Sequence, residues 1–275
     1  MAATKKAAVI GWPVQHSLSP LLHQFWLKQY RIDGTYEKIA VEEKDLARFI
    51  NSLRGGEYKG VNVTVPYKER VMPLLDEIDE SAKTTGAVNV ISVTDGKLIG
   101  SNTDIFGFRT NLEGSGLPLR KKHAVILGAG GAARAVLKSL SDMGFAGVSI
   151  VARDSKKAQE LRNLSSTSVD IISWDDRNEI LSSCDLLVNA TTLGMKGKEI
   201  LQIDLSLLPS HAVVYDIVYN PLITGLLQQA RTRKLGIVDG LGMLIYQAVP
   251  CFEAWFGMRP QVTEELRDYL IGKIS

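Results

Sequence analysis

Cysteine and histidine are scarce in this chain, with two and four copies in 275 residues. Cys184 and Cys251 lie far apart and form no CxxC pair. The histidines show no HxxxH spacing; they are His16, His23, His123 and His211. Without paired cysteines or ligand spacing, the sequence predicts neither a disulfide framework nor a metal site. A reduced protein of the cytoplasm is the expected class.

Strong charge bias and long apolar runs are also absent. The 32 Lys and Arg nearly balance the 30 Asp and Glu, and the basic residues are spread along the chain. A nucleic-acid-binding protein needs a basic face, so we expect no such partner. The run in MAATKKAAVIGW is too short for a secretion signal, and GMLIYQAVPCFEAWFG is interrupted by polar residues and proline. We therefore expect no membrane insertion.

The first part of the chain alternates strand-like with helix-like runs. AAVIGW precedes PLLHQFWLKQYR, TYEKIAV precedes EKDLARFINSLR, and GVNVTV precedes ERVMPLLDEI. This alternation predicts βαβ units and a mostly parallel sheet. Thr94, Asp95 and Gly96 separate AVNVISV from KLIGSN, which predicts a hairpin on the same sheet.

A second series of short apolar strands follows a helical stretch that ends in Gly114-Ser115-Gly116. The series comprises HAVIL, VSIVAR, VDIIS, DLLVNAT, VVYDIVY and GIVDG. It predicts a doubly wound, Rossmann-type sheet. The later helix MLIYQAVPCFEAWF is apolar nearly all round, so we expect it to be buried against the first domain. The predicted fold class is α/β with two domains, which suits the length.

The loop LGAGGAARAV carries the clearest local signal. Gly128, Gly130 and Ala133, with Gly131 and Ala132 between them, fit G-x-G-x-x-G/A directly after a strand and before a helix. The glycines allow a tight turn and close approach to a pyrophosphate, whose charge meets the helix N-terminus. A glycine-rich turn without a ligand is the alternative, but the strand and helix on either side favour a dinucleotide site.

The next strand, VSIVAR, is expected to end near the adenosine ribose. An NAD site usually offers a carboxylate to the 2′-hydroxyl, whereas an NADP site offers arginine to the 2′-phosphate. Arg153 and Lys156 favour NADP, whereas Asp154 is compatible with NAD.

The strand GVNVTVPYK shows polar residues on one face. Val61, Val63 and Val65 alternate with Asn62 and Thr64, so a half-solvated strand is one interpretation. The other is that Asn62 and Thr64 look into a ligand cleft, with Pro66 setting the turn that aims Lys68.

A pair of serines precedes the first helix. Ser19 is the predicted N-cap, with Pro20 at the first helical position. Ser17 is then surplus, and two hydroxyls beside a helix N-terminus suit a carboxylate.

Three further polar residues stand at or in apolar segments. Asn89 and Asp104 lie at or near the ends of apolar runs, where open α/β sheets bind ligands. Gln247 is almost alone in its apolar helix and needs partners, which a ligand or backbone groups could supply.

Eight sequence blocks, in order along nearly the whole chain, carry a family resemblance: VIGWPVQHSLSPLLH, GVNVTVPYKE, GAVNVI, SNTDIFGF, GAGGAARAV, NATTLGM, YDIVYNPLITGLL and DGLGMLIYQAVPCFEAWFG. With these blocks the chain resembles the shikimate dehydrogenase family. The resemblance implies an oxidoreductase that interconverts 3-dehydroshikimate and shikimate with NADP, in the chorismate pathway of aromatic amino-acid biosynthesis.

The resemblance also assigns roles to residues. It implies a catalytic Lys68 paired with Asp104, and substrate contacts from Ser17, Ser19, Thr64, Asn89, Tyr219 and Gln247. Gly240 falls in a block that borders the nicotinamide. Ala152-Arg153-Asp154 departs from the Asn-Arg-Thr of NADP-specific members, so NAD stays open as a cofactor.

The implied organisation is a substrate-binding catalytic domain formed by residues 1–104 and 241–275, and an NADP-binding domain formed by 105–240. The implied partner is the small-molecule substrate, with the protein itself a monomer or a homodimer. Two alternatives remain: a quinate/shikimate dehydrogenase that uses NAD, and a dinucleotide-binding sensor without turnover. Retention of both Lys68 and Asp104 argues against the sensor, which would need no proton donor.

Overall fold

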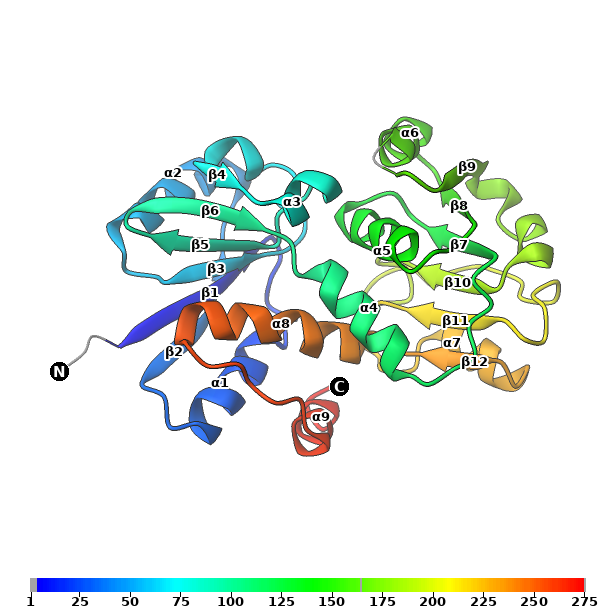
Figure 1. Ribbon diagram of the computed structural model, residues 1–275. Coiled ribbons are helices and arrows are strands. Elements are labelled where there is room, and N and C mark those ends of the chain that lie inside the picture. Colours follow the sequence, from blue (N-terminus) through cyan, green and yellow to red (C-terminus); the bar gives the residue numbers. More distant parts are fainter. Residues whose placement is uncertain (1–3, 164, 275) are drawn as a thin grey trace. The chain divides into compact units, whose positions relative to one another are not determined.

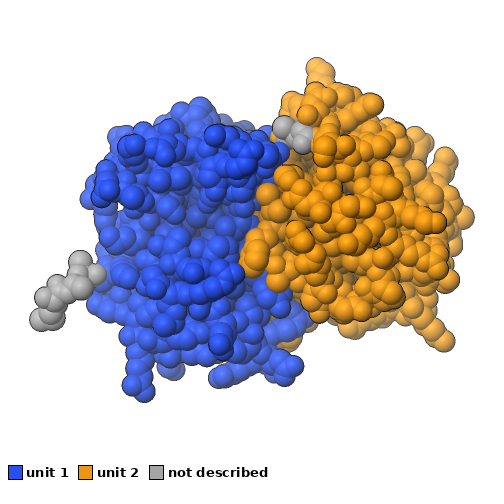
Figure 2. Space-filling model, viewed as in Figure 1, with its two compact units in different colours: residues 1–103, 245–270 blue, residues 104–244, 271–275 orange. Residues whose placement is uncertain are grey.

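The computed structural model describes residues 4–163 and 165–274, and the chain divides into two compact units (Figure 2). Unit 1 consists of Met1–Thr103 and Ile245–Leu270. Unit 2 consists of Asp104–Leu244 and Ile271–Ser275. The predicted α/β class with two mostly parallel sheets is confirmed.

Unit 1 contains a six-stranded sheet in the order β2-β1-β3-β5-β6-β4 (Figure 1). Its strands are β1 (Lys5–Gly11), β2 (Gly34–Ala40), β3 (Gly60–Val63), β4 (Glu77–Ile78), β5 (Val90–Thr94) and β6 (Lys97–Ser101). β1 runs parallel to β2 and β3, β4 runs parallel to β6, and β5 is antiparallel to both of its neighbours.

Most helical segments of unit 1 are short. The full set comprises α1 (Ser19–Gln29), η1 (Glu43–Asp45), α2 (Leu46–Ser52), η2 (Leu53–Gly55), η3 (Met72–Leu74), α3 (Glu80–Thr85), residues 245–256 of α8 (Gly240–Phe256) and α9 (Glu264–Ile271). Ile50 and Leu53 pack with Val61, Val63 and other strand residues in one buried cluster.

The C-terminal segment packs on the N-terminal strands of unit 1, as predicted. Lys5 donates from Nζ to the carbonyl of Phe256 at 2.9 Å, and Trp26 donates from Nε1 to the carbonyl of Gln261 at 3.1 Å. A Cβ at Gly60 would meet Trp255 Nε1 at 2.1 Å. Only glycine therefore allows α8 to approach β3 this closely.

The helix predicted for ERVMPLLDEI is wrong. The spacing of Val71, Leu74 and Ile78 suits a helix, but Pro73 lies among them and only η3 forms. The chain is extended from Leu75 onward, and the Asp76 amide donates to the carbonyl of Leu98 at 3.0 Å. Pairing of β4 with β6 therefore replaces the expected helix.

The hairpin predicted at Thr94-Asp95-Gly96 is confirmed. β5 and β6 pair in antiparallel register with Thr94 opposite Lys97. Asp95 and Gly96 have φ angles of 50° and 76°, the left-handed values that a two-residue hairpin turn of this type requires.

Unit 2 contains a fully parallel sheet in the order β12-β11-β10-β7-β8-β9 (Figure 1). Its strands are β7 (His123–Leu127), β8 (Gly147–Ala152), β9 (Ser168–Ser173), β10 (Leu186–Asn189), β11 (Val213–Asp216) and β12 (Gly236–Val238). The strand order reverses beside β7, and open α/β sheets bind ligands at this kind of switch point.

Both faces of this second sheet are buried. Ala124 and Ile126 of β7 belong to one cluster with Val136 of α5 (Gly131–Asp142), whereas Val125 and Leu127 belong to another. The first cluster also includes side chains from α4 (Asp104–Gly114) and α6 (Ser155–Asn163). The second includes side chains from η5 (Glu179–Ser183) and α7 (Gly225–Thr232). Successive side chains of a strand point to opposite faces of the sheet, so the strands are buried on both faces.

No helix within residues 4–163 and 165–274 is long and apolar enough to span a bilayer. Over the same residues, His, Cys, Asp and Glu side chains form no group of three suited to a metal ion.

Candidate active site

The turn after β3 places Lys68. Thr64 donates its amide to the carbonyl of Ile10 at 2.9 Å, and the chain then passes through a cis Val65–Pro66 peptide. Tyr67 is buried, and its hydroxyl donates to the carbonyl of Val41 at 2.6 Å. The carbonyl of Lys68 accepts the amide of Val88 at 2.7 Å. Main-chain and Tyr67 contacts therefore fix the point from which the half-buried Lys68 side chain extends.

The half-solvated interpretation of β3 is wrong. All four of its residues are buried, and Asn62 is only 6% exposed. Val65, expected to continue the valine face, lies beyond the strand and is 58% exposed. Asn62 is polar because it bonds to other buried groups.

Asn62 lies within a buried polar network. Tyr36 donates from its hydroxyl to Asn62 Oδ1 at 2.6 Å, and Asn62 Nδ2 donates to the carbonyl of Asn89 at 3.1 Å. Asn62 Nδ2 also lies 3.4 Å from Cys251 Sγ. Burial raises the pKa of Tyr36, and a hydrogen bond with the Ser19 side chain acts in the opposite direction. The network thus extends from Ser19 to Asn89.

The network continues to Gln247. Asn89 Oδ1 accepts the Thr103 amide at 2.8 Å, and Asn89 Nδ2 donates to Thr103 Oγ1 at 3.0 Å. Gln247 Oε1 accepts from Thr103 Oγ1 at 3.4 Å and from Asn89 Nδ2 at 3.5 Å. The structure therefore brings Ser19, Asn89 and Gln247 into one network, in which Gln247 has the side chains of Thr103 and Asn89 among its partners.

This network also includes Tyr36, Thr103 and Cys251, which no sequence pattern indicates. Each comes from a different part of unit 1, and none stands out as polar in an apolar run. His23 stacks on Tyr36, with ring centroids 4.0 Å apart and planes at 6°. Burial lowers the pKa of His23 to about 3, so its imidazole is neutral at physiological pH. His23 supports the Tyr36 ring by stacking and carries no charge to the site.

The two serines at the start of α1 do not cap the helix as predicted. The N-cap is Leu18, whose carbonyl accepts the Leu22 amide at 3.1 Å, and no side chain caps the helix. Ser19 is the first helical residue, so the prediction that it is the cap is wrong. Ser17 Oγ accepts the Ser19 amide at 3.3 Å. The helix begins one residue earlier than expected, and the Ser19 hydroxyl contacts Tyr36 instead of the backbone.

The glycine-rich loop in unit 2 joins β7 to α5. Gly128 has a φ of 107°, and a Cβ there would meet Thr191 Cγ2 at 2.9 Å. Gly130 is the N-cap of α5, no side chain caps this helix, and a Cβ on Gly130 would meet nothing within 4 Å. Ala133 is fully buried against the sheet, while Gly131 and Ala132 are partly exposed. The open space above uncapped amides fits a pyrophosphate.

The end of β8 carries the residues predicted to select the cofactor. Arg153 is exposed, and its guanidinium carbon lies 5.9 Å from the centroid of the Trp174 ring. Asp154 accepts the amides of Lys156 and Lys157 at 3.1 Å each, so its carboxylate caps α6. Lys156 lines a surface depression between α6 and β9 that also includes Gln159 and Arg162.

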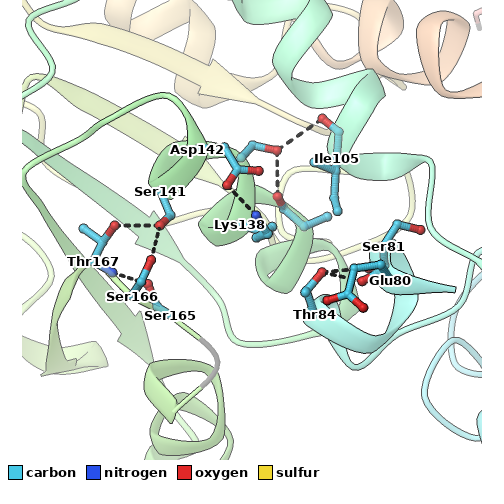
Figure 3. A network of polar contacts seen from close by, with 12 residues as sticks. Glu80, Ser81, Thr84, Ile105, Lys138, Ser141, Asp142, Ser165, Ser166 and Thr167 are labelled. Atoms are coloured by element: carbon cyan, nitrogen blue, oxygen red, sulfur yellow. Dashed lines mark hydrogen bonds and ion pairs between the residues drawn. The ribbon is translucent and has the colours of Figure 1, made fainter.

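Asp104 is the first residue of α4 and is buried. Its helix is held to α5, because Ser139 Oγ donates to the carbonyl of Ala135 at 2.8 Å and to that of Ile105 at 3.2 Å, the residue labelled in Figure 3. By contact, Asp104 and Tyr219 belong to unit 2, whereas Lys68 and the other predicted substrate residues belong to unit 1.

The segment that leads to Tyr219 is fixed by a buried carboxylate. Asp216 Oδ1 accepts from Asn189 Nδ2 at 2.9 Å and from the Val218 amide at 3.0 Å, and Thr224 Oγ1 donates to Oδ2 at 2.6 Å. Burial nevertheless raises the pKa of Asp216 from 3.8 to about 6. Protonated Asp216 therefore contributes to the free energy of unfolding. This contribution is fully present below pH 3.8 and is lost as the pH rises through about 6.

Gly240 lies against Ile217 and Val218, the residues that precede Tyr219. A Cβ there would meet the carbonyl oxygen of Ile217 at 2.2 Å and that of Val218 at 2.8 Å. Only glycine fits at the start of α8 without moving the main chain next to Tyr219.

Comparison with known families decides the assignment. The family model of the shikimate dehydrogenase substrate binding domain matches residues 9–91, and that of shikimate / quinate 5-dehydrogenase matches residues 112–218. The chain belongs to the shikimate dehydrogenase family. A shikimate dehydrogenase (NADP(+)) from Paramagnetospirillum magneticum is 49% identical over 269 residues, which cover 96% of this chain and 97% of the relative.

Solved structures of family members are also similar to this chain. Shikimate 5-dehydrogenase from Thermus thermophilus, in complex with NADP(H) and shikimate, has a TM-score of 0.86 and 32% identity, with 98% of this chain and 100% of that chain covered. Quinate dehydrogenase from Corynebacterium glutamicum, in complex with NAD, has a TM-score of 0.89 and 29% identity, with 97% and 99% covered. Family membership alone is therefore compatible with either substrate and either cofactor.

Proposed function

We propose that this protein is an NADP-dependent shikimate dehydrogenase of the chorismate pathway, which reversibly reduces 3-dehydroshikimate to shikimate in the cytoplasm. The single observation that carries this proposal is the near full-length similarity to curated NADP-dependent enzymes. The substrate-binding catalytic domain is proposed to comprise residues 1–104 and 241–275, and the NADP-binding domain residues 105–240.

On the substrate side, Ser17 and Ser19 are proposed to bind the carboxylate. The ring hydroxyls are proposed to be bound by Thr64, Asn89, Tyr219 and Gln247. Addition to a ketone builds negative charge on its oxygen, and an ammonium group can stabilise that charge and provide a proton. Lys68 is proposed to do both. Asp104 is proposed to orient Lys68 and a substrate hydroxyl. The fixed main chain around Lys68 supports this role, because a preorganised donor needs little rearrangement.

On the cofactor side, the loop from Gly128 to Ala133 is proposed to hold the pyrophosphate, and Gly240 to border the nicotinamide. Bound NADPH supplies the hydride. The capping role of Asp154 supports NADP over NAD, because a carboxylate already engaged by two backbone amides has fewer acceptor positions left for a ribose hydroxyl. Arg153 and Lys156 are proposed to meet the 2′-phosphate.

The direct test is an absorbance assay at the nicotinamide band, with shikimate or quinate and with NADP or NAD in all four combinations. We expect the fastest turnover with shikimate and NADP at equal, subsaturating concentrations. Faster turnover with quinate and NAD would instead place the protein with the quinate dehydrogenases.

Replacement of Ser17 and Ser19 by alanine is expected to raise the KM for shikimate about tenfold or more, because each hydroxyl lost from a carboxylate removes a charge-assisted hydrogen bond. NADP affinity should not change. Steady-state kinetics with each substrate varied in turn provide the measurement. If only the melting temperature fell, the carboxylate site would have to lie elsewhere.

Arg153→Ala is expected to remove most of the preference for NADP by weakening NADP binding while NAD binding stays constant. Asp154→Thr should strengthen the preference slightly, because threonine retains a cap for α6 and removes a negative charge near the phosphate site. The ratio of kcat/KM values for the two cofactors measures both effects. An unchanged ratio in Arg153→Ala would exclude Arg153 from 2′-phosphate binding.

A further inference from the structure

Trp174 lies just beyond β9 and is anchored to the protein interior. Its side chain is partly buried and packs against the cluster that includes Val125, Leu181 and Leu201. Ser173 Oγ accepts the Asp175 amide at 3.3 Å and thereby caps the short helix η4 (Trp174–Asp176). The indole is therefore held in place on the β9 side of β8, the strand that Arg153 directly follows.

Two guanidinium groups lie over the Trp174 ring. That of Arg153 is 5.9 Å from the ring centroid, and that of Arg177 is 5.5 Å from it. Arg177 donates to the carbonyls of Trp174 at 2.8 Å and Gln202 at 2.7 Å. Neither arginine forms an ion pair with any acidic residue in the part of the chain that the structure describes. The Trp174 ring is thus close to two cationic side chains.

We propose that Trp174 is a positioning residue for cofactor selection: its ring holds Arg153 in place to bind the adenosine 2′-phosphate. This inference rests on the proposed use of NADP. The attraction of a guanidinium to an aromatic face leaves its N–H donors, which lie in its own plane, available to phosphate oxygens. A freely rotating, exposed arginine would have to be ordered on binding, whereas one already held by a fixed ring has less freedom to lose.

The test measures binding rather than turnover. Dissociation constants for NADPH and NADH are obtained from nicotinamide fluorescence titrations, with adenosine 2′,5′-bisphosphate as a competitor. Trp174→Leu and Trp174→Met remove the aromatic face, Trp174→Phe keeps a weaker one, and Arg162→Gln removes a cation from nearby α6 without changing the ring. Each Trp174 variant is also made in the Arg153→Ala background.

We expect Trp174→Leu and Trp174→Met to weaken binding of NADPH and of the bisphosphate about three- to fivefold, with NADH unchanged and Trp174→Phe intermediate. In the Arg153→Ala background the same substitutions should have no further effect, because Trp174 acts through Arg153. Arg162→Gln should change NADPH affinity less than about twofold, because Arg162 is not among the residues proposed to contact the 2′-phosphate.

Equal weakening of NADPH and NADH binding would overturn the inference, since it indicates a purely structural role. So would unchanged NADPH affinity, or an effect of full size in the Arg153→Ala background. If Trp174→Leu unfolds, Trp174→Met and Trp174→Phe provide the same comparison of NADPH binding with NADH binding. If Arg153→Ala itself leaves NADPH affinity unchanged, the proposed cofactor site fails instead, and the two failures are thereby distinguished.

Discussion

A Lys68→Met variant is expected to lose at least about a hundredfold in turnover while its binding of shikimate changes far less. Methionine keeps most of the stem but cannot stabilise negative charge or provide a proton. The surrounding turn should persist, because Tyr67 and the main chain fix it independently of the ammonium group. Single-turnover kinetics and shikimate titration separate the two quantities.

Lys59→Met is the matched control for this substitution. Lys59 is exposed and immediately precedes β3, so its replacement removes the same charge at the other end of the same strand. Its turnover should remain within about twofold of the unmodified protein, as surface substitutions rarely have large effects. Near-normal turnover in Lys68→Met would exclude Lys68 from the mechanism.

Gly240→Ala is expected to have the largest effect on stability. Its added methyl group would lie 2.2 Å from the carbonyl oxygen of Ile217 and 2.4 Å from the carbonyl carbon, and main-chain atoms cannot rotate away. Overpacking of this kind costs about 1–3 kcal/mol, and we expect the upper end because the clash is with backbone. The displaced segment leads into Tyr219, so the KM for shikimate should rise as well.

The change in free energy is measured as the shift in the urea midpoint. Gly225→Ala provides the control, because Gly225 also opens a helix of unit 2 and a Cβ there would meet nothing within 4 Å. That variant should be as stable as the original or slightly more so, since alanine favours helix. Equal midpoints for the two variants would contradict the close packing inferred at Gly240.

Local sequence patterns predicted much of the fold correctly. The Asp95-Gly96 turn and the Gly128–Ala133 loop both depend on backbone conformations that neighbouring residues specify, so both were found. The extended segment after Pro73 could not be predicted in this way, because its apolar spacing suits a helix. Only pairing with β6 makes the extended form preferable. Pairing with a distant strand is not encoded in a window of ten residues.

Some residues of the candidate site can likewise be identified from the sequence, and others cannot. Lys68 and the glycine-rich loop could be identified from the sequence because each lies in a distinctive motif. Tyr36 and Cys251 could not, since their importance comes from contact with Asn62, which is distant from both in the chain. Trp174 was missed for the same reason: its relation to Arg153 exists only once β8 and β9 lie side by side.

The discontinuous composition of unit 1 has a consequence for synthesis on the ribosome. Most of unit 2 is one continuous stretch, Asp104–Leu244, and this stretch is synthesised before residues 245–270 of unit 1. Until then, Gly60 lacks its contact with Trp255 and Trp26 lacks its bond to Gln261. Domains generally fold as units while the chain emerges. The apolar surface of β1, β3 and α1 that α8 covers therefore stays open until nearly the whole chain has been synthesised.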